Sequence, residues 1–180
     1  MRVALLHAQF ETIHPFLHGN GRIGRLLIAA LMEQWGLLPE PLRYLSGTLK
    51  RHQREYYRRL SAVRTAGDWE TWVSFFLESV ETAATAAERA IVGIASLVTA
   101  DRRRLLAAPR VGAMALRLFE LLPVMPRFTI AQVQQKLETT FPTATAAVKL
   151  LEDLGMVAEL TGQKKNRSFS YRAYFELLAR

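Results

Sequence analysis

Hydrophobic residues recur at helical spacing from the start of the chain. The positions that would share one buried helix face are Val3, Leu6, Phe10 and Ile13. A residue that precedes proline disfavours helix, so Pro15 predicts that this helix ends before His14. Apolar residues then continue over 23–35 and predict a second, buried helix. The expected local architecture is therefore helix, loop, helix.

Two further patterns follow a connector over 37–42, where two prolines disfavour helix. Residues 46–63 alternate basic and apolar positions, which predicts an amphipathic helix that ends near Gly67. Asp68 is a suitable N-cap for the next helix. The core-facing stripe of that helix is expected to contain Trp69, Trp72, Phe75, Phe76 and Val80.

The second half of the chain begins with an alanine-rich run over 82–106, which predicts a long helix that continues the preceding one. Pro109 ends this helix. Beyond it the hydrophobic periods become short, and tight turns between short helices favour a helix-turn-helix domain with a β-hairpin. The expected elements are helices over 111–122, 129–137 and 143–154, followed by strands over 156–160 and 168–171. Thr129 is expected to cap the second of these helices, and Gly155 is expected to end the third. This division predicts two domains, residues 1–108 and 109–180.

Composition narrows the class of protein. Half of the 180 residues are hydrophobic, which is enough to bury a core. The chain has no cysteine, so disulfides and thiolate metal sites are excluded. The N-terminus lacks a signal-peptide pattern and no apolar run reaches membrane-spanning length, so we expect a cytoplasmic protein with no membrane partner. The net charge of +8 favours an anionic partner such as a nucleotide, a nucleic acid or an acidic protein surface.

Chemically reactive side chains are concentrated in residues 14–25, which read HPFLHGNGRIGR. Gly19 and Gly21 permit a tight loop that leads into a helix N-terminus, where free amides and the helix dipole favour a phosphate. Imidazole exchanges a proton near neutral pH, which suits His14 to the role of general base. The segment therefore predicts a site for transfer of a phosphate-containing group.

The same segment supplies candidate phosphate ligands. Backbone amides of residues 19–22 and the Asn20 side chain would receive the α-phosphate of a nucleotide. Arg22 and Arg25 are three residues apart, so they lie on one face of the helix start. Their guanidinium groups would hold the β- and γ-phosphates.

This string closely resembles the signature of the Fic family, His-Pro-Phe-x-(Asp or Glu)-Gly-Asn-Gly-Arg-x-x-Arg. The resemblance implies a mainly α protein with a Fic-type helical core. It also implies an enzyme that transfers AMP from ATP to a Ser, Thr or Tyr hydroxyl of a target protein, with Mg²⁺ bound by the acidic residue of the signature. By the same resemblance, His14 and Asn20 are catalytic, residues 19–22 and Arg25 bind the nucleotide, and Phe16 is an anchor buried under the loop.

Two features of the chain depart from this resemblance. His18 stands where the family has its acidic Mg²⁺ ligand, although Mg²⁺ prefers oxygen donors. Three outcomes stay open: nucleotide binding without turnover, use of a softer metal at His18, or use of a different phosphate-containing donor. The helices and the β-hairpin flap that precede the motif in the family are not in this sequence, and we expect the surface they would cover to form a homodimer.

The segment from Leu150 to Val157 resembles the end of a winged-helix recognition helix, so the second domain is expected to be a winged helix-turn-helix with a small β-hairpin. If it binds DNA, the residues expected to contact it are Thr143, Thr145, Lys149, Lys164, Lys165 and Arg167. Only Lys149 is basic on the recognition face, which makes dimerisation or protein docking an equal alternative. Two functions stay open: a protein adenylyltransferase, or a catalytically silent Fic relative that regulates through its winged helix.

Overall fold

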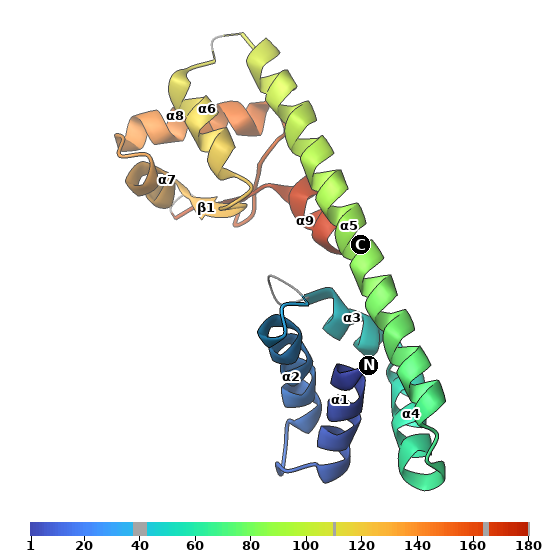
Figure 1. Cartoon of the computed structure of the whole chain (residues 1–180). Helices are drawn as coiled ribbons and strands as arrows, with labels where there is room; N and C mark the ends of the chain where they lie inside the picture. The colour runs from blue at the N-terminus through green and yellow to red at the C-terminus, as the bar shows by residue number, and fades with distance from the viewer. Residues whose placement is uncertain (38–42, 110, 164–165, 180) are drawn as a thin grey trace. The chain divides into compact units, whose positions relative to one another are not determined.

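The computed structural model describes residues 1–37, 43–109, 111–163 and 166–179. It is mainly helical and carries one small antiparallel sheet (Figure 1), which confirms the expected fold class. The chain divides into two compact units, Met1–Glu88 and Arg89–Arg180. Each unit has its own hydrophobic core, so each is described by itself.

Unit 1 contains the candidate site and is built from helices alone in its described part. Its elements are α1 (Arg2–Ile13), α2 (Asn20–Gln34), α3 (Arg43–Arg51), α4 (Gln53–Ala66) and the beginning of α5 (Trp69–Ala107). Trp72 is fully buried in the core, and its indole N–H donates to the Ala4 carbonyl over 2.9 Å. This bond joins α5 to α1 across the core, beneath the helices that form the site.

The buried face of α1 differs from the predicted one. Leu6 is 44% exposed and Ile13 is 63% exposed, whereas the buried positions are Val3, Ala4, His7, Ala8 and Glu11. Small side chains on this face, together with Gly24 of α2, allow the two helices to approach closely. The buried face of α1 therefore has smaller side chains than the predicted face, and it includes two ionisable residues, His7 and Glu11.

The amphipathic segment expected over 46–63 forms two helices, because α3 ends at Arg51 and α4 begins at Gln53. Gly67 ends α4 in the left-handed conformation, with φ of 63°, as its position predicted. Asp68 confirms its predicted capping role, since its carboxylate accepts from the Thr71 backbone N–H over 3.3 Å. Most of the expected connector, residues 38–42, lies outside the described residues.

The long helix predicted after Asp68 is α5, which is continuous over 39 residues and ends before Pro109. Trp72 and Phe76 of the expected stripe are buried, but Trp69 is 40% exposed. Within the described residues, α5 is also long and apolar enough to cross a membrane, with mean hydropathy of 1.3 in a window that is 11% buried. This finding departs from the sequence expectation. Length and composition alone do not distinguish such a helix from one that packs against protein.

Unit 2 combines helices with the sheet. Its elements after α5 are α6 (Ala113–Leu121), β1 (Arg127–Thr129), α7 (Ile130–Lys136), α8 (Phe141–Asp153), β2 (Ala158–Glu159), β3 (Ser168–Ser170) and α9 (Arg172–Ala179). The sheet order is β1-β3-β2, and both pairs are antiparallel. Phe128 lies opposite Phe169 in the register, and their rings stack with centroids 5.9 Å apart. The short sheet is thus fixed by a buried aromatic pair.

The structure confirms the three helices and the hairpin expected in this part, with strands shorter than predicted. Thr129 caps α7 through a capping box with Gln132, and Gly155 adopts a φ of 69° after α8. Strand β1 and helix α9 were not predicted. The three residues of β1 are too few for a period-2 pattern to identify.

The boundary between the two compact units falls inside α5, between residues 88 and 89. The C-terminal part of α5 packs with unit 2, because Leu105 is fully buried in its core. Asp101 is buried as well and accepts a hydrogen bond from the Tyr171 hydroxyl over 2.8 Å.

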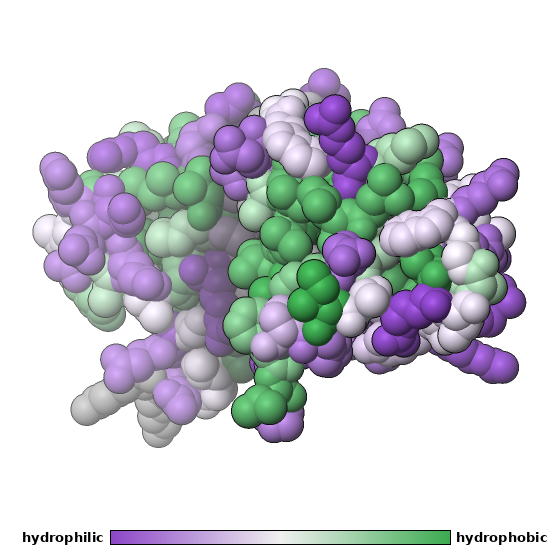
Figure 2. Space-filling model, turned by 60° about the horizontal axis from the view of Figure 1, so that its bottom comes forward, coloured by the Kyte–Doolittle hydropathy of each residue, from purple (hydrophilic) through white to green (hydrophobic). Residues whose placement is uncertain are grey.

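One face of the molecule shows hydrophobic side chains interspersed with hydrophilic ones (Figure 2).

Candidate functional site

The motif forms a loop between α1 and α2 whose two ends adopt left-handed conformations. His14 has a φ of 49°, and its backbone N–H donates to the Phe10 carbonyl over 2.9 Å, which closes α1. Gly19 has a φ of 87° and is the N-cap of α2. This conformation is costly for residues with a side chain, which explains the glycine at the start of α2.

The Asn20 side chain holds the loop together. It is 2% exposed, its Oδ1 accepts from the Phe16 backbone N–H over 3.0 Å, and its Nδ2 donates to the Phe16 carbonyl over 2.5 Å. The Phe16 ring itself is 47% exposed, so the expectation that it anchors the loop by burial is wrong. Its ring lies beside the Phe10 ring, with centroids 6.4 Å apart, and the two hydrogen bonds from Asn20 fix its backbone.

The N-terminus of α2 presents two free amides. The Arg22 and Ile23 backbone N–H groups both donate to the Gly19 carbonyl over 3.0 Å. No acceptor among the described residues faces the amides of Asn20 and Gly21. The first turn of a helix is positive in potential, so these two amides are available to an anion.

Both motif arginines fold back over the loop glycines. A Cβ built at Gly19 would lie 3.7 Å from Arg22 Nη2, and one built at Gly21 would lie 3.5 Å from Arg25 Nη1. Neither arginine forms an ion pair with another described residue. The two guanidinium groups and the two amides therefore lie close together at the first turn of α2.

These groups line a cleft of about 450 Å³. Its volume is within the range of about 300–1,000 Å³ that is typical of small-molecule sites. The wall opposite the motif comes from α3 and α4, which contribute Leu49, Lys50, Gln53, Tyr56 and Tyr57. The lining residues that the structure describes include three cations, Arg22, Arg25 and Lys50, and no carboxylate. The cleft is thus suited to a polyanion.

A buried hydrogen-bonded pair lies below this cleft. His7 Nδ1 is 3.1 Å from the Gly24 carbonyl oxygen, and its Nε2 is 2.8 Å from the Tyr56 hydroxyl. A carbonyl only accepts, so Nδ1 carries the proton and Nε2 accepts from Tyr56. Burial, with a smaller contribution from nearby Arg25, lowers the pKa of His7 to about 4. The imidazole is consequently neutral and holds Tyr56 in place at the cleft.

Tyr56 is itself shielded from water, and burial followed by the adjacent Glu11 carboxylate raises its pKa above the ordinary value. Its ring packs edge-on against Tyr57, with centroids 5.1 Å apart. Tyr57 is half exposed and lines the cleft, whereas Tyr56 is 3% exposed. Of these two tyrosines, only Tyr57 offers an accessible ring for an aromatic base.

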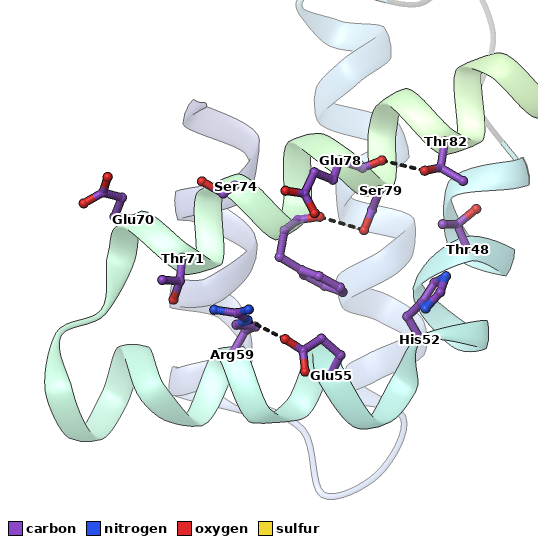
Figure 3. A pocket seen from close by; sticks show the side chains of 11 residues that line it. Thr48, His52, Glu55, Arg59, Glu70, Thr71, Ser74, Glu78, Ser79 and Thr82 are labelled. Carbon is purple, nitrogen blue, oxygen red and sulfur yellow. Dashed lines mark hydrogen bonds and ion pairs between the residues drawn. The ribbon is translucent and has the colours of Figure 1, made fainter.

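A second pocket of about 530 Å³ lies elsewhere in unit 1, among α3, α4 and the start of α5 (Figure 3). Figure 3 shows Glu55 joined to Arg59 at its floor, and Ser79 and Thr82 bonded to helix carbonyls. Its three glutamates, Glu55, Glu70 and Glu78, make it an unfavourable place for phosphate. The smaller, cationic cleft is therefore the better candidate for a nucleotide.

The residues at the motif do not fit Mg²⁺. His18 is exposed at the cleft and provides a nitrogen, whereas Mg²⁺ takes oxygen ligands in octahedral geometry. The described residues contain no group of three or more His, Cys, Asp or Glu that could hold a metal ion. The charge that a metal would supply is present in part as Arg22, Arg25 and Lys50.

Sequence reasoning missed the contribution of α3 and α4 to this cleft. Helical spacing in the sequence relates the lining residues Lys50, Gln53 and Tyr57. Spacing alone does not show which part of the protein these side chains face. Sequence reasoning also missed His7 and Glu11, which precede the motif by one or two turns of α1. Their burial depends on the close approach of Gly24, which is a tertiary feature.

The candidate DNA-contacting residues are only partly brought together in unit 2. Thr143, Thr145 and Lys149 all lie on α8, where Lys149 is exposed and the Thr145 hydroxyl donates to the Phe141 carbonyl over 2.8 Å. Thr145 and Arg167 line a common groove of about 560 Å³, and Arg167 lies over the Phe169 ring at 5.4 Å. Lys164 and Lys165 lie outside the described residues.

Comparison with known proteins finds similarity over the segment that carries the motif loop. Residues 1–32, which include α1, the loop and most of α2, match the model of the Fic/DOC family. The similarity therefore covers the segment that carries the motif loop and most of α2.

Three relatives share similarity with part of the chain. It is 42% identical over 62 residues to a probable protein adenylyltransferase of Aquifex aeolicus, which covers 34% of this chain and 16% of the relative. It is 35% identical over 78 residues to the protein adenylyltransferase Fic of Aedes aegypti, covering 43% of this chain and 14% of the relative. It is 32% identical over 78 residues to the protein of the same name from Drosophila grimshawi, covering 43% of this chain and 15% of the relative. The chain thus spans about one sixth of these relatives or less.

Proposed function

We propose that the cleft of unit 1 binds a nucleoside triphosphate, ATP by analogy with its relatives, and transfers AMP to a hydroxyl group of a target protein. One observation carries this proposal: the same cleft is lined by an exposed histidine and by two helix amides and two arginines that have no acceptor or ion-pair partner among the described residues. The relatives named above are protein adenylyltransferases, which supports the same activity. The target protein is identified only by its hydroxyl group.

Each group has a distinct role in the proposed reaction. The amides of Asn20 and Gly21 hold the α-phosphate, and Arg22 and Arg25 hold the β- and γ-phosphates. His14 accepts the proton of the target hydroxyl as its oxygen bonds to the α-phosphorus. The bond from that phosphorus to the bridging oxygen breaks, and pyrophosphate leaves with the negative charge that the arginines neutralise.

Asn20 acts in this scheme through the loop and not through direct contact with phosphate. Both ends of its amide are bonded to the Phe16 backbone, and its side chain is almost fully buried. It holds the preceding loop against the first turn of α2, where the two amides are presented. The half-exposed ring of Tyr57 provides a surface on which the adenine can stack.

The test is incubation with ATP labelled at the α-phosphorus, in Mg²⁺ and separately in Mn²⁺, with label transfer to protein as the readout. We expect the parent protein to transfer label and His14→Ala to lose about 100-fold or more, since general base catalysis contributes at least that factor. His52→Ala removes an exposed histidine outside the cleft and is expected to change nothing. His18→Asp restores an oxygen ligand and is expected to raise the Mg²⁺-dependent rate.

The second candidate is a catalytically silent Fic relative that acts as a regulator. It is favoured by the cleft lining, in which the described residues include no carboxylate for a metal. In the label-transfer assay, labelling by His18→Asp alone would support this function and contradict the first. Retained labelling by His14→Ala would remove the histidine from the mechanism.

We also propose that unit 2 is a winged helix-turn-helix, because the element order from α6 to β3 and the sheet order β1-β3-β2 suit that architecture. If it binds DNA, α8 and Arg167 supply the contacts. Neutralising Lys149, Lys164, Lys165 and Arg167 together should then abolish a salt-dependent shift of duplex DNA. Arg64→Ala, on α4 of unit 1, is the control. An unchanged shift in the neutralised protein would favour protein docking instead.

A further inference from the structure

The side chains that line the cationic cleft offer few oxygen atoms to a metal ion. Among the described lining residues, those with a side-chain oxygen are Asn20, Gln53, Tyr56 and Tyr57. Asn20 Oδ1 already accepts from the Phe16 backbone N–H, and the Tyr56 hydroxyl is bonded to His7 Nε2 over 2.8 Å. The oxygens that remain belong to an amide and a phenol, whereas protein sites for Mg²⁺ combine carboxylates with substrate phosphates. The donor set is therefore not that of a Mg²⁺ site.

Two carboxylates lie on helices beside the cationic cleft, but neither is among its lining residues. Glu11 of α1 is 8% exposed, and a Cβ at Gly24 would overlap its Oε1, so this oxygen lies between α1 and α2. Glu55 of α4 accepts from Arg58 over 2.7 Å and from Arg59 over 2.6 Å, and it lines the other pocket (Figure 3). Neither carboxylate is therefore presented to an ion in the cleft.

The cationic cleft carries positive side chains on two sides. Arg22 and Arg25 come from α2, and Lys50 comes from α3 in the opposite wall. None of the three forms an ion pair with another described residue. Because Mg²⁺ is a dication, a nucleotide that carries it presents less negative charge than the free nucleotide. Charge complementarity therefore favours the free nucleotide in this cleft.

Lys50 is suited to the place that a metal ion would take beside the phosphates. Its ammonium is a compact charge with three donors on a flexible stem, and lysine is a common phosphate ligand. The residue is exposed, so packing does not hold its stem away from the cleft. The two arginines lie against the loop glycines on the other side. A phosphate chain in the cleft would thus meet positive charge from both walls.

We propose that the cationic cleft binds its nucleoside triphosphate without a divalent metal, with the Lys50 ammonium in the place of the ion. This inference rests on the proposed nucleotide site and adds to it the form of the nucleotide that is bound. The observation that carries it is a lining with three cations and, among the described residues, no carboxylate. His18 is exposed at the cleft and adds no negative charge that a metal would have to offset.

The test is equilibrium titration of ATP into the full chain, once in excess EDTA and once in excess Mg²⁺. We expect binding in EDTA to be at least as tight as binding in Mg²⁺. Binding that requires Mg²⁺ would overturn the inference and leave the proposed function standing. Failure of ATP to bind in either condition would instead contradict the nucleotide site itself, and the inference with it.

An exchange-inert Cr(III) complex of ATP applies the same test with a nucleotide that cannot lose its metal. We expect it to bind at least about tenfold more weakly than free ATP, because the metal cancels charge that the three cations would otherwise meet. Equal affinity of the two nucleotides would contradict the inference. Tighter ATP binding in Zn²⁺ or Mn²⁺ than in EDTA, lost in His18→Ala, would assign this histidine to a softer metal and overturn it as well.

Replacement of Lys50 tests its assigned role. Lys50→Gln should weaken ATP binding in EDTA by about tenfold or more, since it removes a charge-assisted hydrogen bond. Addition of Mg²⁺ should recover part of this loss. Lys136→Gln is the matched control, because Lys136 is an exposed lysine of α7 in unit 2. Equal affinity of the parent and Lys50→Gln in EDTA, with both folded by circular dichroism, would overturn the assignment.

Replacement of His18 by aspartate should reverse the preference for free ATP. The added carboxylate repels the phosphates and offers Mg²⁺ an oxygen ligand. His18→Asp should therefore bind ATP more weakly than the parent in EDTA and more tightly once Mg²⁺ is added. An affinity that responds to Mg²⁺ equally in the parent and in His18→Asp would contradict the inference.

Discussion

At the residue scale, the candidate site depends on a neutral histidine that the motif does not include. His7 is fully buried, stacks on Trp72 with ring centroids 6.0 Å apart and bonds both Gly24 and Tyr56. It connects α1, α2 and α4, the elements that hold or line the cleft. Its protonation state therefore affects the stability of unit 1.

Acidification is expected to destabilise the protein through His7. Its pKa is about 4 in the folded state and 6.5 as the ordinary value, so the unfolded chain binds the extra proton between these pH values. Stability is full above pH 6.5 and falls as the pH drops towards 4, by on the order of 3 kcal/mol. The free energy of unfolding in urea, measured over this pH range for the parent and for His7→Gln, tests this prediction. The same pH slope in both proteins would contradict the assignment, and His52→Gln is the matched control.

Gly24 is expected to resist any side chain. A Cβ there would overlap Glu11 Oε1 and lie 2.9 Å from His7 Cε1. Glu11 Oε1 is buried without a hydrogen-bond partner in the described structure, so a Cβ at Gly24 would press on a carboxylate that is already enclosed. Gly24→Ala should therefore destabilise the protein by about 1–3 kcal/mol.

The control for this substitution is Gly47→Ala, which lies in α3 with open space around it. Alanine is the better helix former, so Gly47→Ala should stabilise by up to about 1 kcal/mol. Chemical denaturation of both variants gives the comparison. Equal effects of the two substitutions would mean that the contact between α1 and α2 is looser than described.

Much of the site could be predicted at this scale because its residues are contiguous. His14, the two glycines and both arginines act at adjacent backbone positions, so local sequence determines their arrangement. His7 and Tyr56 meet across 49 residues, and their contact arises only when the helices pack. Phe16 shows the converse, since the resemblance implied an anchor buried under the loop and the structure leaves this residue half exposed.

At the scale of elements, capping residues predicted helix starts better than hydrophobic patterns predicted faces. Asp68 and Thr129 both cap the helices assigned to them. The face of α1 was predicted incorrectly because Leu6 and Ile13 fit a helical period but do not pack. A capping residue bonds to backbone groups close to it in the sequence, whereas the buried face of a helix depends on which other helix packs against it.

The capping box of α7 provides the prediction at this scale. Thr129 accepts from the Gln132 backbone N–H over 3.3 Å, and Gln132 Oε1 accepts from the Thr129 N–H over 2.8 Å. Thr129→Ala should cost about 1 kcal/mol of stability. Thr129→Ser keeps the hydroxyl and should retain most of it. Thermal melts of the two variants that coincide would show that the box contributes nothing.

At the scale of the whole molecule, the chain combines two units with separate cores and different chemistry. Unit 1 holds the cationic cleft, and unit 2 holds the sheet with its paired Phe128 and Phe169. Helix α5 belongs to both, which places the boundary inside a helix where sequence punctuation cannot mark it. The central claim concerns unit 1: its cleft binds nucleotide phosphates through α2 and its arginines.

Titration of ATP into the parent protein, Arg25→Ala and Arg64→Ala tests this claim most directly. Charge-assisted hydrogen bonds contribute about 1.5–3 kcal/mol each, so Arg25→Ala should weaken ATP binding by about 10- to 100-fold. Arg64 is an exposed arginine of α4 outside the cleft, and its substitution should leave the affinity unchanged. Equal affinity of the parent and Arg25→Ala, with both proteins folded, would contradict the account.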